Sequence, residues 1–173
     1  MMKRIVILGS TGSIGRMALD VISRHRDEFA VVGLAAGKNI DLLEEQAKIF
    51  QPEIVAVADR AAAAELGKRL GRKFDVFSGE EGVATVAAHV GSDFVLSAMV
   101  GFSGLLPTLR AIEQGKVIGL ANKESLVIAG SIVMERARER GVMILPVDSE
   151  HSAIFQCIEG YDGRHLERII LTA

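Results

Sequence analysis

The amino-acid sequence predicts an α/β protein with a doubly wound, mostly parallel sheet that is covered by helices on both faces. Short runs of β-branched and other apolar residues alternate with stretches of helical periodicity almost to the end of the chain. A glycine-rich turn at residues 9–15 joins the first apolar run to the first helical stretch. Together, these two observations are typical of strand–helix–strand units that assemble into one parallel sheet.

The composition is that of a soluble chain with a well-filled core. Its 173 residues are 49% hydrophobic, and 20 basic residues intermix with 22 acidic ones to give a formal charge of −2. No basic stripe is present, which argues against nucleic acid or a membrane surface as a partner. Cys157 is the only cysteine, and no apolar run approaches the roughly 20 residues of a membrane span. We therefore expect a cytoplasmic protein.

Each element of the sheet has its own signal. Seven strands are expected, at residues 4–8, 30–35, 54–58, 74–77, 93–97, 117–121 and 143–147. Capping boxes predict the starts of two intervening helices, at Asp41 with Glu44 and at Ser78 with Glu81. The spacing of apolar residues predicts two further helices, over 102–115 and 124–140. Four helices are followed by a glycine suited to end them, namely Gly71, Gly91, Gly115 and Gly141.

The last part of the chain departs from this rhythm. We expect a short buried helix over residues 153–158, with Cys157 in its core, and a strand over 168–171. An apolar strand at a chain end would leave an exposed edge, so we interpret the chain as a fragment that stops just inside a second, α+β domain. The predicted division is a first domain over residues 1–150 and the start of a second over 151–173.

The glycine turn predicts a phosphate site. Gly9, Gly12 and Gly15 follow an apolar strand and open a helix, which is the context of a Rossmann-type dinucleotide site. The first glycine permits a tight turn, the second lets backbone approach a pyrophosphate, and the third lets the helix pack close to the strand. The helix start offers unpaired N–H groups and a positive dipole end to the anion. The alternative is an ordinary strand-to-helix turn.

The end of the second strand indicates which dinucleotide binds. NAD-binding units usually place an acidic residue here, where it would bond the ribose 2′-hydroxyl. This chain has no acid at that place and continues with Gly37, Lys38 and Asn39. Lys38 would attract a 2′-phosphate that a carboxylate would repel, so the sequence favours NADP over NAD. The alternative is a solvated surface lysine.

A first polar cluster, Asn122-Lys123-Glu124, follows the sixth expected strand. Ligands of open α/β sheets bind beyond the carboxyl ends of strands, so this cluster is a candidate for cofactor or substrate contact. The alternative is a helix start with Asn122 as its N-cap and Glu124 favourable to the dipole. Lys123 does not fit that alternative, because a cation in the first helical turn is mildly unfavourable.

A second polar cluster follows the seventh expected strand and contains Asp148 and Glu150. On an extended segment, residues two apart point to the same side, so both carboxylates would face one space. Hard oxygen ligands of this kind suit Mg²⁺ or Mn²⁺. The alternative is helix capping by Asp148 or Ser149. We expect His151 to be a hydrogen-bonded structural histidine rather than a ligand.

These blocks together resemble one enzyme family, 1-deoxy-D-xylulose 5-phosphate reductoisomerase. The resemblance follows the order of the chain and is most specific at residues 146–156, which begin Pro-Val-Asp-Ser-Glu-His-Ser. It implies NADPH and a divalent metal as cofactors. It also implies rearrangement and reduction of 1-deoxy-D-xylulose 5-phosphate to 2-C-methyl-D-erythritol 4-phosphate, a step of non-mevalonate isoprenoid synthesis, by an enzyme that is a homodimer at full length.

The resemblance also implies residue roles. The pyrophosphate side of NADPH would be lined by Thr11, Gly12, Ser13 and Ile14, and the 2′-phosphate end by Gly37, Lys38 and Asn39. Asn122 and Glu124 would also contact the cofactor, and Lys123 would reach the substrate and act in catalysis. The metal ligands would be Asp148 and Glu150, with Ser149 and Glu150 facing the phosphosugar substrate and Glu150 also acting in catalysis.

Members of this family are more than twice as long as this chain. The chain would hold the cofactor half and two metal ligands but not a complete substrate site, so we expect it to be inactive alone. Two alternatives stay open at this point. One is another NADP-dependent reductase of homoserine or semialdehyde dehydrogenase type, and the other is a non-catalytic NADP-binding module.

Overall fold

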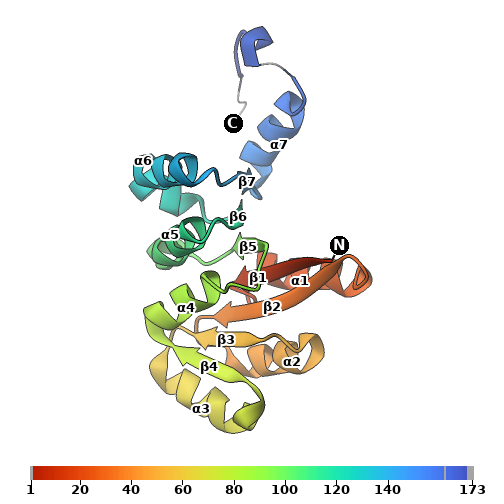
Figure 1. Cartoon of the computed structure of the whole chain (residues 1–173), viewed down its shortest axis with the longest axis vertical. Coiled ribbons are helices and arrows are strands. Elements are labelled where there is room, and N and C mark those ends of the chain that lie inside the picture. Colours follow the sequence, from red (N-terminus) through yellow and green to blue (C-terminus); the bar gives the residue numbers. More distant parts are fainter. Residues whose placement is uncertain (1, 162, 171–173) are drawn as a thin grey trace.

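The computed structural model describes residues 2–161 and 163–170 and confirms the predicted fold class (Figure 1). Seven strands form one sheet in the order β4-β3-β2-β1-β5-β6-β7, and every neighbouring pair is parallel. After β4 the chain crosses back to the other side of β1, which is the reversal of a doubly wound sheet. The strands are β1 (Lys3–Leu8), β2 (Phe29–Ala36), β3 (Ile54–Val57), β4 (Asp75–Ser78), β5 (Phe94–Ser97), β6 (Val117–Leu120) and β7 (Ile144–Pro146).

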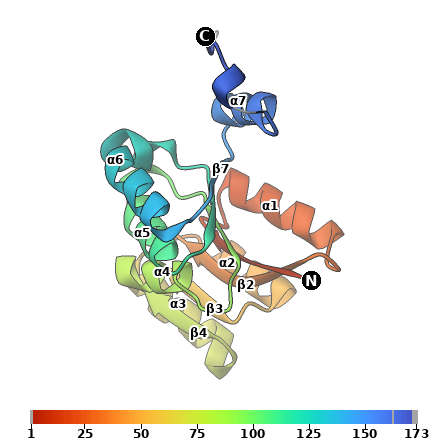
Figure 2. The same ribbon diagram turned by 45° about the horizontal axis from the view of Figure 1, so that its top comes forward.

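Helices cover both faces of this sheet, as predicted. One face packs against α1 (Ser13–Arg24), α2 (Ile40–Phe50) and α3 (Arg60–Leu70). The other packs against α4 (Gly79–Ala87), α5 (Leu105–Glu113) and α6 (Lys123–Arg140). Figure 2 shows α1 on the side of the sheet opposite to α4, α5 and α6. The described residues also form three short 3₁₀ turns, η1 (Gly71–Lys73), η2 (Gly101–Gly104) and η3 (Gly163–His165).

The two faces are filled by alternate residues of the same strands. In β1, Ile5 and Ile7 enter the core beneath α1–α3, whereas Val6 and Leu8 enter the core beneath α4–α6. Successive side chains of a strand point to opposite faces, so a strand covered on both faces has to be apolar throughout. This is why the strands could be recognised as unbroken apolar runs.

Some helix ends differ from the prediction. Helix α2 is capped by Asn39, whose side-chain oxygen accepts a hydrogen bond from the N–H of Leu42, so Asp41 lies inside the first turn instead. Ser78 does precede α4, but its hydroxyl forms no capping bond. Gly91 lacks the positive φ of a helix-ending glycine, because α4 ends at Ala87.

The end of the chain differs most. Helix α7 spans Ser149–Ile158 and projects away from the sheet (Figures 1 and 2), and none of its residues is buried. The predicted core position of Cys157 is wrong, since this residue is exposed. Residues 166–170 form no strand, and the remainder of the predicted strand, residue 171, lies outside the described residues. Within the described residues, no helix combines the length and apolarity that crossing a membrane requires.

Candidate functional site

The register of the sheet brings the predicted site segments to one edge. Paired residues Ala35, Leu8, Ser97, Leu120 and Pro146 form a row across β2, β1, β5, β6 and β7 at their carboxyl ends. Each of the polar segments follows one of these residues. Neighbouring strands lie about 4.8 Å apart, so the glycine turn after β1 and the acidic segment after β7 are separated by about 14 Å along the edge. The site is therefore an elongated edge rather than a single pocket.

Two glycines of the turn are required by sterics. Gly9 has φ +82°, and a Cβ there would lie 2.5 Å from the carbonyl oxygen of Ala98 after β5. A Cβ on Gly15 would collide with the backbone of Gly9 and Ser10. The turn is thus wedged between two strand ends, and α1 starts in direct backbone contact with it. Both predicted roles, the tight turn and the close packing, are confirmed.

The start of α1 is open to an anion. Gly12 is the N-cap residue and provides no side-chain cap, and the first turn contains no acidic residue. Within the described residues, the N–H groups of Thr11, Ser13 and Ile14 form no hydrogen bond. Unpaired N–H groups at the positive end of a helix dipole favour a phosphate. The predicted pyrophosphate segment therefore has the required donors.

The segment after β2 lies beside this turn. Gly37 and Lys38 are exposed, and a Cβ on Gly37 would meet no atom within 4 Å. The side chain of Asn39 caps α2, so the helix start fixes the backbone on which Lys38 stands. In the described part of the chain, Lys38 is in no ion pair and its side chain is exposed.

The loop after β5 is a part of the site that sequence reasoning did not identify. Ala98 contacts Gly9, and the carbonyl groups of Met99 and Gly101 both accept hydrogen bonds from the Asn122 side-chain amide. This loop stands at the point where the strand order reverses, which is where dinucleotides bind in such sheets. The position of the fifth strand in the sheet could have pointed to it, but its residues carry no charged side chain to mark it.

Asn122 has a structural role at this edge. It is buried and caps α6, with its Oδ1 accepting hydrogen bonds from the backbone N–H and the hydroxyl of Ser125. Its Nδ2 donates to the loop after β5. All hydrogen-bonding positions of the side-chain amide are thus engaged within the protein. By contrast, Lys123 and Glu124 are exposed in the first turn of α6.

Asp148 is the N-cap residue of α7. Its Oδ1 accepts hydrogen bonds from the backbone N–H of His151, at 2.9 Å, and from the Nδ1 of the same residue, at 2.7 Å. Partial burial opposes ionisation of Asp148, but these hydrogen bonds outweigh it and hold the pKa of the carboxyl below its ordinary value. The carboxylate is therefore charged at neutral pH, and His151 is the hydrogen-bonded histidine that the sequence predicted.

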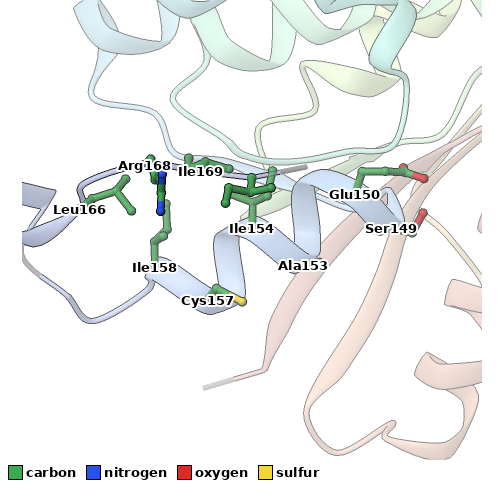
Figure 3. Close-up of a pocket in the computed structure, with 10 residues that line it drawn as sticks. Ser149, Glu150, Ala153, Ile154, Cys157, Ile158, Leu166, Arg168 and Ile169 are labelled. Carbon is green, nitrogen blue, oxygen red and sulfur yellow. The ribbon is translucent and has the colours of Figure 1, made fainter. Parts of the chain in front are cut away.

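The two acidic residues do not face one space in the way the sequence predicted. Residues 149–158 are helical, so the alternation of an extended segment ends at Asp148. Asp148 lines a cavity of about 200 Å³ together with Lys123, whereas Ser149 and Glu150 line a hollow of about 560 Å³. Figure 3 shows Ser149 and Glu150 at one end of that hollow, with Ile154 and Ile158 directed toward the segment of Leu166 and Ile169. The expectation that both carboxylates face one space is wrong because the helix begins at Ser149, four residues before the expected start at residue 153.

Each of the two carboxylates has the donor chemistry of a hard-cation ligand, and the two line separate hollows. Asp148 Oδ2 and the Glu150 carboxylate form no hydrogen bond within the described residues. Mg²⁺ is commonly bound by one or two carboxylates together with water and substrate oxygens. No group of three or more acidic, histidine or cysteine side chains gathers in the part of the chain that the structure describes. Two carboxylate donors are thus what these residues can offer.

The doubly wound sheet, the open α1 start and the polar strand ends define a dinucleotide-binding α/β domain. Comparison with known proteins assigns the family. A family model described as 1-deoxy-D-xylulose 5-phosphate reductoisomerase matches residues 5–130, and the model of the C-terminal domain of the same enzyme matches residues 144–173. The chain belongs to the 1-deoxy-D-xylulose 5-phosphate reductoisomerase family.

Individual relatives agree with this assignment. A 1-deoxy-D-xylulose 5-phosphate reductoisomerase 1 of Bacillus cereus is 53% identical over 173 residues, which are 100% of this chain and 45% of the relative. Among solved structures, a reductoisomerase in complex with NADPH, fosmidomycin and magnesium has a TM-score of 0.87 and 38% identity, over 92% of this chain and 40% of that one. The Zymomonas mobilis enzyme in complex with NADPH gives 0.87 and 39%, over 92% and 42%. The chain thus spans about half the length of the curated relatives it matches.

Proposed function

We propose that this chain is the cofactor half of an enzyme that converts 1-deoxy-D-xylulose 5-phosphate to 2-C-methyl-D-erythritol 4-phosphate, using NADPH and a divalent metal. The observation that carries the proposal is the row of strand ends. Along this row, the open start of α1 follows β1, Lys38 follows β2 without an ion pair to any described residue, and a cavity lined by Lys123 and Asp148 lies after β6 and β7; these features support the proposal. The family assignment supplies the reaction that such a row would serve.

NADPH is assigned to the edge from β2 to β6. Its pyrophosphate would lie against the turn at Thr11, Gly12, Ser13 and Ile14, where the N–H groups of Thr11, Ser13 and Ile14 can donate to it and the N–H of Gly12 donates to the Gly9 carbonyl. Its 2′-phosphate would lie at Gly37, Lys38 and Asn39, where Lys38 supplies a positive charge. When bound, NADPH supplies the hydride for the reduction. The complexes of two relatives with NADPH support this assignment.

Two residues at the start of α6 were also assigned to the cofactor. Glu124 is exposed in the first turn of α6, and its carboxylate would contact the cofactor. The Asn122 side chain has no free hydrogen-bonding group, so we assign its effect on the cofactor to its hold on the loop after β5. The placement of that loop at the strand-order reversal supports a contact with the nicotinamide end.

The metal is assigned to Asp148 and Glu150. A relative's complex with magnesium favours Mg²⁺, with Mn²⁺ as the alternative hard cation. A cation held by these carboxylates would supply Lewis acidity toward a substrate oxygen. Ser149 and Glu150 would face the phosphosugar, and Glu150 would also act in catalysis. Lys123 shares its cavity with Asp148, so its ammonium group can neutralise negative charge that develops on a substrate oxygen.

The remaining assignments concern the whole protein. We propose that residues 1–150 form the NADP-binding domain and that residues 151–173 begin the catalytic domain. The full-length enzyme would be a cytoplasmic homodimer that binds a small phosphosugar. The single cysteine and the mixed surface charge support the cytoplasmic assignment.

Replacing Asp148 with Asn in the full-length enzyme tests the metal role. Asparagine caps helices as well as aspartate does, so α7 keeps its cap while the site loses a charge. We expect kcat to fall at least about a hundredfold at fixed metal concentration, with the Kd of NADPH unchanged within about twofold. Loss of NADPH binding together with turnover, or no loss of either, would contradict the assignment.

Asp59→Asn is the matched control. Asp59 caps α3 in the same way, through a hydrogen bond to the N–H of Ala62, but follows β3 and is remote from the cavity of Lys123. We expect this variant to retain metal-dependent turnover. A similar loss in both variants would show that capping, and not metal binding, explains the effect.

A second candidate is a non-catalytic NADPH-binding module formed by this chain alone. The two buried clusters beneath α1–α3 and α4–α6 favour it, because they give the dinucleotide edge a core within the described residues. NADPH binding by the 173-residue chain, without turnover when metal and substrate are added, would support it. Turnover by the chain alone would exclude it.

A further inference from the structure

A buried glutamine connects the glycine turn to helix α2. Gln46 is 5% exposed, and its Nε2 donates a hydrogen bond of 2.9 Å to the carbonyl oxygen of Ser10, 36 residues earlier in the chain. The same helix starts at Asn39, directly after Lys38. One element therefore holds both segments that we assign to the phosphates of NADPH, the turn after β1 and the loop after β2.

This hydrogen bond fixes the orientation of one peptide group. The N–H groups of Gly9 and Ser10 donate to the carbonyl of Ala35, which anchors the start of the turn to β2. The Ser10 carbonyl is directed inward to Gln46. Because the peptide bond is planar and trans, the N–H of Thr11 has to point in the opposite direction. The glutamine thus directs an unpaired donor away from α2, on the side where the turn is open.

The polar character of Gln46 is not explained by packing. Within the described residues, two buried side-chain polar atoms lack a hydrogen-bond partner, Gln46 Oε1 and Ser10 Oγ, and they belong to the two residues that this hydrogen bond joins. An unpaired buried polar atom destabilises the fold, and an apolar side chain of similar volume would fill the site without that cost. A glutamine in this place is therefore accounted for by what its amide does to the turn.

We propose that Gln46 is a positioning residue for the cofactor, which aims the Thr11 N–H at the pyrophosphate of NADPH through its hold on the Ser10 carbonyl. This inference rests on the proposed NADPH function. Without the hydrogen bond, the Ser10–Thr11 peptide is free to rotate, and the turn loses a fixed donor. The segment of Lys38 is unaffected, because Asn39 caps α2 independently of Gln46.

Gln46→Met in the 173-residue chain tests the proposal, since methionine has a similar volume but no donor. We expect the Kd of NADPH to rise about tenfold, the effect of one lost hydrogen bond to a charged group. The Kd of 2′-AMP, which has the 2′-phosphate but no pyrophosphate, should stay within about twofold of the original value. In ¹H–¹⁵N NMR spectra, the shift of the Thr11 amide on NADPH addition should be lost or strongly reduced.

Gln51→Met is the matched control. Gln51 also donates its Nε2 to a backbone carbonyl, that of Lys48 at 2.7 Å, but it is exposed at the far end of α2. This variant should bind both ligands as the original chain does. Gln46→Asn, which keeps the amide but shortens the side chain by one methylene, should reproduce the selective loss and guards against a folding defect of the methionine variant.

The outcomes separate this inference from the proposed function. Unchanged NADPH affinity in both Gln46 variants would overturn the inference and leave the function intact. An equal loss for NADPH and 2′-AMP would also overturn it, because that result indicates a general structural role. Absence of NADPH binding by the unaltered chain would overturn the proposed function and this inference together.

Discussion

Two regions of the molecule bury their apolar side chains to different extents. The first is the sheet with its six covering helices, and the second is the segment that starts at α7. Leu34, Leu66 and Ile118 are fully buried in the first region. In the second region α7 has no buried residue, and Ile169 and Ile170 are 52% and 73% exposed. Burial of one such side chain is worth about 1.5–3 kcal/mol. The edge assigned to the cofactor is therefore supported by a buried core, whereas the residues assigned to the metal lie at the start of a helix that has no buried residue.

The largest expected effect comes from adding one methyl group to the glycine turn. In Gly15→Ala the new Cβ would overlap the backbone of Gly9 and Ser10, which cannot move without displacing α1. We expect a loss of about 3 kcal/mol or more in the free energy of unfolding, together with loss of NADPH binding, as measured by urea denaturation and ligand titration.

Gly130→Ala is the control for this variant. Gly130 lies in α6 directly after a kink at Ala129, and a Cβ there would meet only the Leu126 Cβ, at the ordinary distance of 3.8 Å. Because alanine favours helix over glycine, we expect a gain of up to about 1 kcal/mol. If Gly15→Ala were equally harmless, the close contact between turn and helix would be refuted.

A pair of core truncations compares the two regions directly. Leu66→Ala removes a fully buried side chain of α3 and should lower the free energy of unfolding by about 3 kcal/mol. Ile154→Ala removes a half-buried side chain of α7 and should cost less than about 1 kcal/mol in the 173-residue chain. Equal costs in urea denaturation would mean that α7 belongs to the same cooperative core as the sheet.

At the cofactor edge, Lys38→Ala should weaken NADPH binding about tenfold and leave NADH binding unchanged. The reason is that the lysine charge pairs with the 2′-phosphate, which NADH lacks. Fluorescence titration with both nucleotides measures the difference. Lys48→Ala removes an exposed lysine of α2, the helix that follows Lys38; Lys48 pairs with Glu44, and its loss should alter neither affinity. A parallel loss for both nucleotides would contradict the NADP assignment.

The smallest expected effect lies at the amino edge of the sheet. Glu53 is hydrogen-bonded to His89 at 2.8 Å and paired with Arg4. The His89 bond, opposed by partial burial and assisted by Arg4, lowers the pKa of Glu53 below its ordinary value of 4.5. A lowered pKa stabilises the fold above the unfolded-state value, and this contribution is lost as the pH falls through the folded-state value.

Glu53→Gln tests this pair. Since half of the Glu53 side chain is exposed, screening limits the loss at pH 7 to about 0.5 kcal/mol in the free energy of unfolding. Below the folded-state pKa of Glu53, where the carboxyl is protonated in both states, the variant and the original chain should unfold at the same urea concentration. A difference that persists at acid pH would show that the charge of Glu53 is not its cause.

The sequence was sufficient for the sheet because its signals are local. Strands such as β1 and β3 are covered on both faces and are therefore made largely of apolar residues. The glycine turn has a local signal as well, because steric contacts there require residues without a side chain. Helix caps were harder to predict, because Asn39 and Asp41 are both suitable N-caps and lie two residues apart. In the structure β2 ends at Ala36 and α2 begins at Ile40, so Asn39 is the residue at the N-cap position.

Contacts between distant segments could not be predicted from one sequence. Nothing local marks Gln46 as a partner of Ser10, or Asn122 as the support of the loop after β5. The wrong expectation that Asp148 and Glu150 face one space has a different cause. The segment was interpreted with the two-residue period of a strand, but α7 begins at the next residue and changes the period to 3.6.

The aligned strand ends fix the distances between the segments that follow them. Four intervals of about 4.8 Å separate the lysine loop from the acidic segment, and hydrogen-bonded pairing fixes each interval. Substitutions in a loop can change which ligand group binds at that strand end, but they do not change the distances between the strand ends. A protein of this design can exchange one nucleotide or one metal for another by altering a single loop, whereas a substrate of different length would demand a different number of strands.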